Sequence, residues 1–331
     1  MASSDVSTTA DQPINIVGAG LTGSMMALYL AQRGYDVRLF EMRDDLRTTE
    51  FEGGRSINLA LSTRGLCALD GVGLEAQARE LCIPMYGRMI HDRQGELSFQ
   101  SYGQQDQHIN SVSRADLTRL LIEHADDYEG VDFDFCHRCT DVDLDQTAVL
   151  AEDQTTGESV RSEAQLVIGA DGAYSAVRSR LQRTERFDYQ QSFLDHGYKE
   201  LVIPPGPDGE WQLDKNALHI WPRHDFMFIA LPNPDGSFTG TLFLPFEGRH
   251  KSFDALDTPE RVDRFFAEQF PDVHPLMPDL TDDFLDNPVG SLVTIPYSRA
   301  SARQREINML LPDAISFMYA LSVGGLNQLE I

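Results

Sequence analysis

The sequence is poor in basic residues, and lysine is almost missing. It contains three lysines, Lys199, Lys215 and Lys251. Lysine and arginine together number 27 against 52 acidic residues, so the formal net charge is −25. A phosphate backbone would repel such a surface, and this argues against a nucleic-acid-binding protein. The same balance suits either a simply acidic protein or one adapted to a salty cytosol, where ions screen self-repulsion.

Cysteine is also scarce, with four residues at positions 67, 82, 136 and 139. The run "CHRC" at 136–139 has the spacing of a redox or zinc pair, but the sequence offers no second pair of ligands. The alternation around it predicts a strand, on which residues three apart point to opposite faces. We therefore expect structural cysteines and no metal site.

Export and membrane signals are weak in this sequence. The start "MASSDVSTTA" has neither a basic nor an apolar region, so it does not resemble a signal peptide. The longest apolar stretch, "MLLPDAISFMYALSVGGL", is interrupted by Pro312 and Asp313. We expect a cytoplasmic protein without a membrane span.

A glycine-rich turn near the start predicts a nucleotide site. Residues 13–44 read as strand, turn, helix and strand, and Gly18, Gly20 and Gly23 form GxGxxG between the first strand and the helix. The first glycine permits the tight turn, the second admits a pyrophosphate, and the third allows close helix packing. The helix start, at Leu21 and Thr22, offers unpaired N–H groups to the phosphates.

The acid after the second strand completes this pattern. Glu41 follows "DVRLF", where a carboxylate can accept hydrogen bonds from ribose hydroxyls. Arg43 could favour a 2′-phosphate, but the carboxylate before it would repel one. Asp171 and Gly172 lie at another strand-to-helix turn, "GADG", where capping of the helix is the simpler explanation for the acid. Two turns so far apart in the sequence favour an extended dinucleotide such as FAD over NAD.

The remaining pattern predicts an α/β part followed by a β-rich part. Helices are expected at 64–82, at 111–127 with Ser113 and Asp116 at its start, and at 258–270. A buried strand, a turn and a helix are expected at 164–181. After residue 185, short aromatic and β-branched runs separated by turn residues predict an antiparallel sheet.

Several motifs together resemble the single-component FAD-dependent aromatic monooxygenases. They are "VGAGLTG" with "FE", "SVSRADL" and "VIGADGAYSAVRS". Five further runs, "GRSINLALSTRG", "PMYGRMIHD", "HGYKEL", "LHIWPR" and "ALPNPDGSFTGTLFLP", resemble the members that act on L-kynurenine. The resemblance covers about residues 13–298. It implies a Rossmann-like α/β FAD-binding domain at 13–75 and 105–182, and a β-sheet substrate domain at 76–104 and 183–290.

The resemblance also implies the chemistry. FAD would be the bound cofactor and NADPH the reductant, which agrees with the lack of a second GxGxxG in the sequence. With O₂, a flavin hydroperoxide would hydroxylate L-kynurenine to 3-hydroxykynurenine. A related monooxygenase acting on another aromatic acid is the alternative within the same class.

Residues matching the family's motifs supply the expected site. Arg88 would bind the substrate carboxylate with Tyr102 as its hydroxyl partner, whereas the plainer explanation for Arg88 is a surface ion pair. Arg114 matches a flavin-contacting arginine, and an ion pair at the helix start is its alternative. Asn58 would face the flavin and the substrate. Four residues of the predicted sheet would line the aromatic pocket, although the pattern alone would make them core: Ile229, Leu231, Thr241 and Phe243.

The chain departs from the family after "PYS". The family continues with a strand ending in Gly-Asp and a run containing "GQG", whereas this chain reads "LLPDA", with Pro312 in place of the glycine and Asp313 as a stand-in. Residues 299–331 are therefore expected to be a divergent tail, truncated relative to the family. Two explanations stay open: a truncated or frameshifted product, which would be a catalytically impaired FAD-binding remnant, and a natural tail that still closes the site.

Overall fold

The computed structural model describes residues 12–48, 58–104, 106–185, 187–299 and 308–310. The chain divides into two compact units that interleave along the sequence. The first comprises residues 1–50, 118–191 and 295–319, and the second comprises 51–117, 192–294 and 320–331. The domain limits expected from the sequence stay a prediction.

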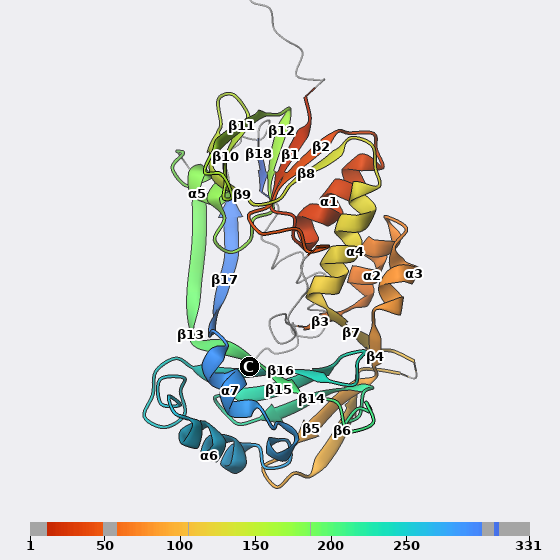
Figure 1. The fold of residues 1–331 in the computed structure, drawn as a ribbon, viewed down its shortest axis with the longest axis vertical. Coiled ribbons are helices and arrows are strands. Elements are labelled where there is room, and N and C mark those ends of the chain that lie inside the picture. Colours follow the sequence, from red (N-terminus) through yellow and green to blue (C-terminus); the bar gives the residue numbers. More distant parts are fainter. Residues whose placement is uncertain (1–11, 49–57, 105, 186, 300–307, 311–331) are drawn as a thin grey trace, which may run out of the picture. The chain divides into compact units, whose positions relative to one another are not determined.

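The first unit is built on a parallel sheet of five strands (Figure 1). Helix α1 (Leu21–Ala31) connects the buried strand β1 to β2, as the glycine pattern predicts. Every pair of neighbouring strands in this sheet is parallel, so their carboxyl ends meet at one edge. In spatial order the strands are β18 (Asn308–Leu310), β12 (Leu166–Gly169), β1 (Ile14–Val17), β2 (Val37–Phe40) and β8 (Val131–Asp134).

A three-stranded antiparallel sheet and the short helix α5 (Ala176–Leu181) also belong to the first unit. Its strands are β9 (His137–Asp143), β10 (Ala148–Asp153) and β11 (Ser159–Glu163). The single strand predicted across "CHRC" is wrong. The chain leaves β8 and enters β9 in a different sheet, and Cys136 makes this turn with a positive φ of 59°.

The second unit begins with a small sheet and two helices. Strands β3 (Asn58–Leu61), β7 (Ile109–Ser113) and β4 (Ile83–Met85) form the sheet. Helix α4 (Arg114–Asp126) follows β7, and its residues from Thr118 onward belong to the first unit. The Ser113 hydroxyl accepts a hydrogen bond from the backbone N–H of Asp116 at 3.3 Å, which confirms the expected cap. The helix expected at 111–127 begins three residues late, at Arg114, because residues 111–113 pair in β7. The single helix predicted at 64–82 is wrong: it is two helices, α2 (Thr63–Asp70) and α3 (Glu75–Glu80), because Gly73 turns between them with a φ of +78°.

A seven-stranded sheet dominates the second unit. Consecutive strands β14, β15 and β16 pair antiparallel, as do β13 and β16, which confirms the sheet expected after residue 185. β5 joins this sheet from much earlier in the chain, as a parallel neighbour of β14. In spatial order the strands are β17 (Gly290–Arg299), β13 (Asp188–Ile203), β16 (Phe238–Pro245), β15 (Met227–Pro232), β14 (Ala217–Pro222), β5 (Gly87–His91) and β6 (Leu97–Ser101).

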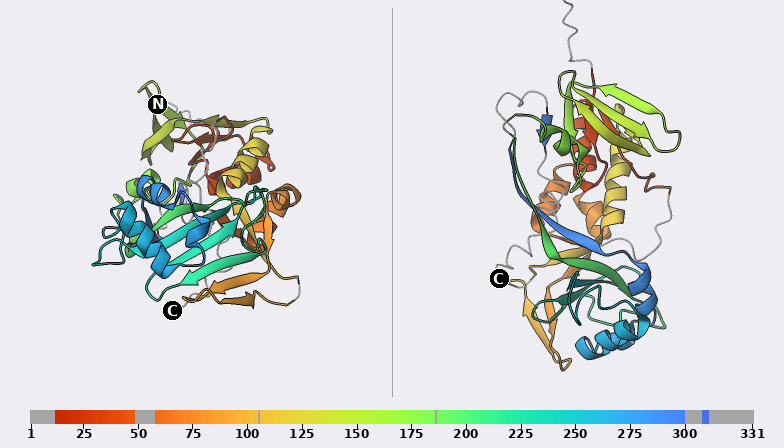
Figure 2. Two further views of the ribbon diagram at one scale, coloured as in Figure 1. Left: turned by 60° about the horizontal axis from the view of Figure 1, so that its bottom comes forward. Right: turned by 90° about the vertical axis from the view of Figure 1, so that its left-hand side faces the viewer.

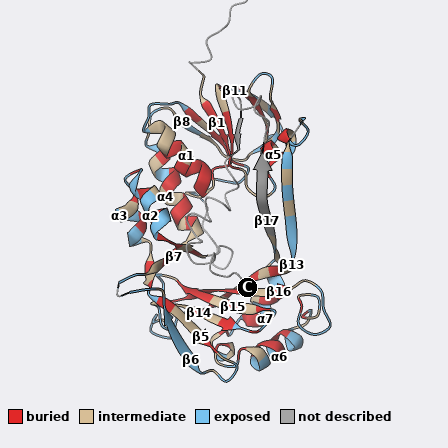
Figure 3. Cartoon of the chain, turned by 180° about the vertical axis from the view of Figure 1, so that it is seen from behind, coloured by how far each residue is buried: buried red, intermediate tan, exposed pale blue. Residues whose placement is uncertain are grey.

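The two faces of this sheet differ in burial. One face packs under α6 (Pro259–Gln269) and α7 (Leu280–Asp286), as Figure 2 shows, and forms an aromatic core. Burial alternates with period two along β13 and β14, so the residues that these two strands place on the opposite face are less buried than those in the core. At the edge of the sheet, every residue of β6 is exposed (Figure 3). The core residues include Leu201, Trp221, Phe228, Leu242, Val262, Phe266, Phe270 and Phe284.

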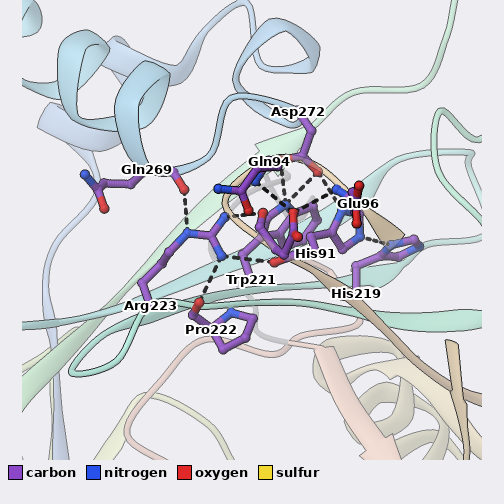
Figure 4. Close-up of polar contacts among 10 residues, drawn as sticks. His91, Gln94, Glu96, His219, Trp221, Pro222, Arg223, Gln269 and Asp272 are labelled. Carbon is purple, nitrogen blue, oxygen red and sulfur yellow. Dashed lines mark hydrogen bonds and ion pairs between the residues drawn. The ribbon is translucent and has the colours of Figure 1, made fainter. Parts of the chain in front are cut away.

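A buried polar chain interrupts this core beneath β5 (Figure 4). The Asp272 carboxylate lies 2.6 Å from Nδ1 of His91, and Nε2 of His91 lies 2.8 Å from Nδ1 of His219. Nε2 of His219 lies 2.8 Å from the backbone oxygen of Asp214. The indole N–H of Trp221 also donates to Asp272. Both histidines are 2% exposed, so their hydrogen bonds are shielded from water.

This chain predicts a specific loss of stability in acid. Burial lowers the pKa of His219 from 6.5 to about 4, with His91, Asp214 and Asp272 facing the ring. The unfolded protein binds a proton at His219 near pH 6.5, whereas the folded protein binds it only near pH 4, so acid favours unfolding between these values. Urea unfolding should show that His219 lowers the free energy of unfolding by about 3 kcal/mol as the pH falls from 6.5 to 4. The His219→Gln variant should show a smaller decline, and equal declines would contradict this prediction.

Candidate functional site

The two glycine turns expected to contact a cofactor lie side by side in the first unit. They follow the neighbouring parallel strands β1 and β12 at the same edge of the sheet. Gly18 has a φ of +96°, and a Cβ atom there would lie 2.5 Å from the backbone oxygen of Ala170. A Cβ atom on Gly23 would lie 1.8 Å from the backbone oxygen of Gly18. The first and third glycines of the motif are therefore required by close backbone contacts.

Contacts among the described residues do not require a glycine at the middle position of the motif. A Cβ atom on Gly20 would have no atom within 4 Å, so the backbone faces open space at the start of α1. The first turn of α1 holds no acidic residue, and its N–H groups have no acceptor within the helix. The Thr22 hydroxyl is buried there with no hydrogen-bond partner in the part of the chain that the structure describes. This arrangement fits the pyrophosphate of a dinucleotide such as FAD, with Leu21 and Thr22 at the helix start.

Glu41 connects the glycine turn to the end of β2. One oxygen of its carboxylate accepts the backbone N–H of Ala19 at 2.9 Å, and the other accepts the N–H and Nε of Arg43 at 3.0 and 2.8 Å. A carboxylate offers about four lone-pair sites, so Glu41 keeps capacity for a ribose hydroxyl. The Arg43 guanidinium is engaged with Glu41, which gives it a role in holding this carboxylate.

The second turn is held by its own side chains. Asp171 accepts hydrogen bonds from the Ser175 hydroxyl at 2.6 Å and from the backbone N–H of Ala176 at 2.7 Å, so it helps to cap α5, whose N-cap residue is Ser175. Gly172 has a φ of +78°, and a Cβ atom there would also face open space. Arg178, buried beneath the turn, donates to the backbone oxygens of Gly172 and Ala173. The capping explanation for Asp171 is therefore observed, and its contact with a cofactor stays a prediction.

In the second unit, the expected substrate residues share one face of the seven-stranded sheet. Ile229 pairs with Thr241 and with Ile220, which pairs in turn with Ile90 of β5. These residues form one row across the sheet, and Arg88 lies two residues from Ile90 on the same strand. Leu231 and Phe243 lie two residues from Ile229 and Thr241, on the same face. This is the face opposite to the aromatic core.

Arg88 and Tyr102 are brought together as expected. The Arg88 guanidinium lies over the Tyr102 ring, with 5.2 Å between the guanidinium carbon and the ring centroid. Burial raises the pKa of the Tyr102 phenol, although the neighbouring arginine opposes this shift. The phenol therefore stays protonated at neutral pH and can donate a hydrogen bond. A guanidinium beside a phenol donor is suited to a carboxylate.

Asn58 forms hydrogen bonds within the second unit, and Arg114 lies close enough to Glu200 to influence its charge. The Asn58 amide donates to the side chain of Asn233 at 2.6 Å and to the backbone oxygen of Pro232 at 3.2 Å, so it joins β3 to the end of β15. Burial raises the pKa of the Glu200 carboxyl on β13, and the charge of Arg114 opposes this shift. Arg114 therefore lies near an acid, in line with the ion-pair alternative, and the cofactor role of Arg114 and the substrate role of Asn58 stay predictions.

Comparison with known proteins places this fold and these motifs in a family. The family model described as "FAD binding domain" matches residues 11–208. The chain is 51% identical over 283 residues to kynurenine 3-monooxygenase of Myxococcus xanthus, covering 85% of this chain and 61% of that protein. It is 44% identical over 314 residues to kynurenine 3-monooxygenase of Salinispora arenicola, covering 94% of this chain and 68% of that protein. The chain belongs to the kynurenine 3-monooxygenase family of FAD-binding proteins.

Solved structures with low sequence identity support the same fold. The tetrameric form of 2-methyl-3-hydroxypyridine-5-carboxylic acid oxygenase matches with a TM-score of 0.70 at 19% identity, over 93% of this chain and 78% of that one. PqsL of Pseudomonas aeruginosa matches with a TM-score of 0.67 at 18% identity, over 95% of this chain and 81% of that one. The Rossmann-like FAD-binding fold with a β-sheet domain, expected from the motifs, is confirmed.

The chain spans 61% of the length of the first kynurenine 3-monooxygenase relatives that it matches. The predicted tail at 299–331 and its Asp313 lie outside the described residues, apart from Arg299 and strand β18. Among the residues that the structure does describe, no helix is long and apolar enough to cross a membrane.

The structure also explains one family motif that had no assigned role. In "HGYKEL", residues of β13 alternate between the two faces of the sheet, so Tyr198 and Glu200 share the face of Thr241 and Phe243. Lys199 points to the core, where its ammonium donates to the backbone oxygen of Phe284 and lies 4.5 Å from that ring's centroid. Burial lowers the pKa of Lys199. Because side chains alternate between the two faces of a strand, the motif itself could have predicted that Lys199 faces away from Tyr198 and Glu200.

Proposed function

We propose that this protein is an FAD-dependent, NADPH-using monooxygenase that hydroxylates L-kynurenine to 3-hydroxykynurenine, a step of tryptophan catabolism by the kynurenine pathway. The observation that carries the proposal is the Arg88–Tyr102 pair beside an apolar row on one sheet face. L-Kynurenine is an amino acid with an aryl ketone, so it presents a carboxylate and a flat ring. These two groups match a cation with a phenol donor and a partly buried apolar surface.

Each group of residues has a separate task in this proposal. Arg88 binds the substrate carboxylate through charge-assisted hydrogen bonds, and Tyr102 donates a further one. Ile229, Leu231, Thr241 and Phe243 hold the aromatic ring and exclude water from it. The orientation of the ring is then fixed at both of its ends, which is the protein's main contribution when the cofactor performs the chemistry.

The residues of the first unit would hold FAD. The open backbone at Gly20 and the start of α1 would receive the pyrophosphate, and Glu41 would bind the ribose. When bound, FAD supplies the redox chemistry, taking electrons from NADPH and passing one atom of O₂ to the substrate. Arg43 and Arg178 keep Glu41 and the Gly172 turn in position.

The proposal is tested with the purified chain after loading with FAD and desalting. We expect retained flavin absorbance, NADPH consumption that L-kynurenine stimulates, and 3-hydroxykynurenine as the product. A panel of other aromatic acids separates this activity from that of a related monooxygenase. Folded protein that retains no flavin, or that oxidises NADPH equally with and without every acid, would refute the proposed activity.

A further inference from the structure

The hydrogen bonds beneath β5 fix how many protons the two buried histidines hold. The backbone oxygen of Asp214 only accepts, so Nε2 of His219 carries a hydrogen. The Asp272 carboxylate also accepts, so Nδ1 of His91 carries a hydrogen. One more hydrogen lies between Nε2 of His91 and Nδ1 of His219. The two rings therefore hold three N–H hydrogens, one more than two neutral imidazoles, and the pair carries a positive charge.

The surroundings place this charge on His91. Burial lowers the pKa of His219 to about 4, so that ring is neutral at physiological pH. Burial alone would raise the pKa of Asp272, but hydrogen bonds from His91 and Trp221 outweigh it and lower that pKa, which keeps the carboxylate ionised. An imidazolium of His91 and the carboxylate of Asp272 thus form a charged pair inside the core. Removing one member of such a pair leaves the other uncompensated.

His91 lies on the strand that carries Arg88. Arg88 and His91 lie three residues apart on β5, so they point to opposite faces of the sheet. On its outer side β5 pairs with β6, whose residues are all exposed (Figure 3). Asp272 follows α6, so its bond to His91 fastens the underside of β5 to the helical layer.

Arg223 adds a second attachment at the same end of β5 (Figure 4). Its guanidinium donates to the backbone oxygens of His91 at 3.0 Å and Asp92 at 3.1 Å, and to that of Gln269 at the end of α6 at 2.6 Å. Arg223 is 2% exposed. The end of β5 is thus connected to β14, which Arg223 follows, and to α6.

We propose that the Asp272–His91–His219 chain is a positioning element for Arg88, which fixes strand β5 through a buried imidazolium–carboxylate pair. The inference rests on the proposed role of Arg88 in binding the substrate. It assigns a function in recognition to His91 and His219, on the core face of the sheet, and to Asp272, in the segment after α6. None of them is a catalytic residue, because none shares the face of Arg88.

The test compares Asp272→Asn with a matched core variant in the FAD-loaded protein. Asp272→Asn keeps the shape of the side chain and removes its charge, and we expect the Kd for L-kynurenine to rise about fivefold or more. Amide hydrogen exchange in β5 should quicken in the same variant. Phe284→Leu truncates a buried ring that contacts Phe253 and Phe266, and it should lower Tm without either effect.

The outcomes distinguish this inference from the proposed function. The positioning role is refuted if Asp272→Asn and Phe284→Leu have the same Kd for L-kynurenine and the same rate of amide hydrogen exchange in β5. If the unmodified protein binds no L-kynurenine, the proposed function fails, and exchange in β5 still decides whether the pair holds this strand. Nitrogen-15 spectra should show that one of the His91 and His219 rings is doubly protonated. Two singly protonated rings at these positions would overturn the charge assignment.

Discussion

Replacing Gly23 with alanine is expected to abolish FAD retention and to lower the free energy of unfolding by about 3 kcal/mol or more. The added Cβ atom would lie 1.8 Å from the backbone oxygen of Gly18, so either α1 or the glycine turn must move. Both belong to the edge of the sheet where β1 and β12 end, so the displacement spreads to the Gly172 turn. Urea unfolding measures the loss of stability, and flavin absorbance after desalting measures the loss of FAD.

Gly20→Ala is the matched control for this experiment. It adds the same methyl group three residues before Gly23, at a position where the structure has no atom within 4 Å. Gly20 has a φ of −72°, which alanine adopts without strain. The stability of the FAD-free protein should therefore be unchanged, whereas FAD binding should weaken because the methyl group occupies the proposed pyrophosphate position. Normal FAD retention by Gly20→Ala would show that the pyrophosphate does not lie at this turn.

Arg88→Ala is expected to weaken L-kynurenine binding about tenfold or more, because charge-assisted hydrogen bonds contribute roughly 1.5–3 kcal/mol each. FAD content should not change, since the expected cofactor contacts of the glycine turn lie in the other unit. Tyr102→Phe should weaken binding less, because it removes one neutral donor and keeps the ring beside the guanidinium. Titration of the FAD-loaded protein with L-kynurenine measures the three dissociation constants.

Arg79→Ala provides the control for the loss of a positive charge. Arg79 forms an exposed ion pair with Glu75 one helical turn away on α3, at 2.7 Å, and belongs to the same unit as Arg88. Such pairs contribute little to stability and should not affect the substrate. Equal affinities for Arg88→Ala and Arg79→Ala would assign Arg88 to the surface ion pairs that so acidic a protein contains.

Features set by neighbouring residues could be predicted from the sequence. The strand, turn and helix around Gly18, Gly20 and Gly23 could be recognised because the spacing of these glycines is a local pattern. Ser113 likewise marks the start of α4 by its spacing from Asp116. The predictions failed where a turn breaks a continuous pattern. Apolar spacing continues through Gly73 and alternation continues through Cys136, but the backbone reverses at both. A positive φ is uncommon for a residue other than glycine, so the sequence pattern does not predict the turn at Cys136.

The site could be predicted in part for the same reason. Arg88 and Tyr102 lie in recognisable motifs, and the short connection between β5 and β6 brings them together. The partners of His91 come from β14 and from the segment after α6, and Asp272 lies 181 residues away in the sequence. Hydrophobic periodicity reports which face of an element is buried, but it does not report which distant polar group meets another. These groups meet only because β5 pairs with β14 and the segment after α6 reaches His91.

That pairing has a consequence for how the protein folds. Strand β5, which carries Arg88, ends at residue 91, but its parallel neighbour β14 begins at residue 217. Strand β1 likewise ends at residue 17, and its parallel neighbour β12 is at 166–169. During synthesis the early strands of both units remain without these neighbours while the intervening chain is made. Such non-local pairings slow folding and leave strand edges unprotected for longer. We therefore expect the order in which the strands are synthesised, rather than the length of the chain, to limit the rate of folding.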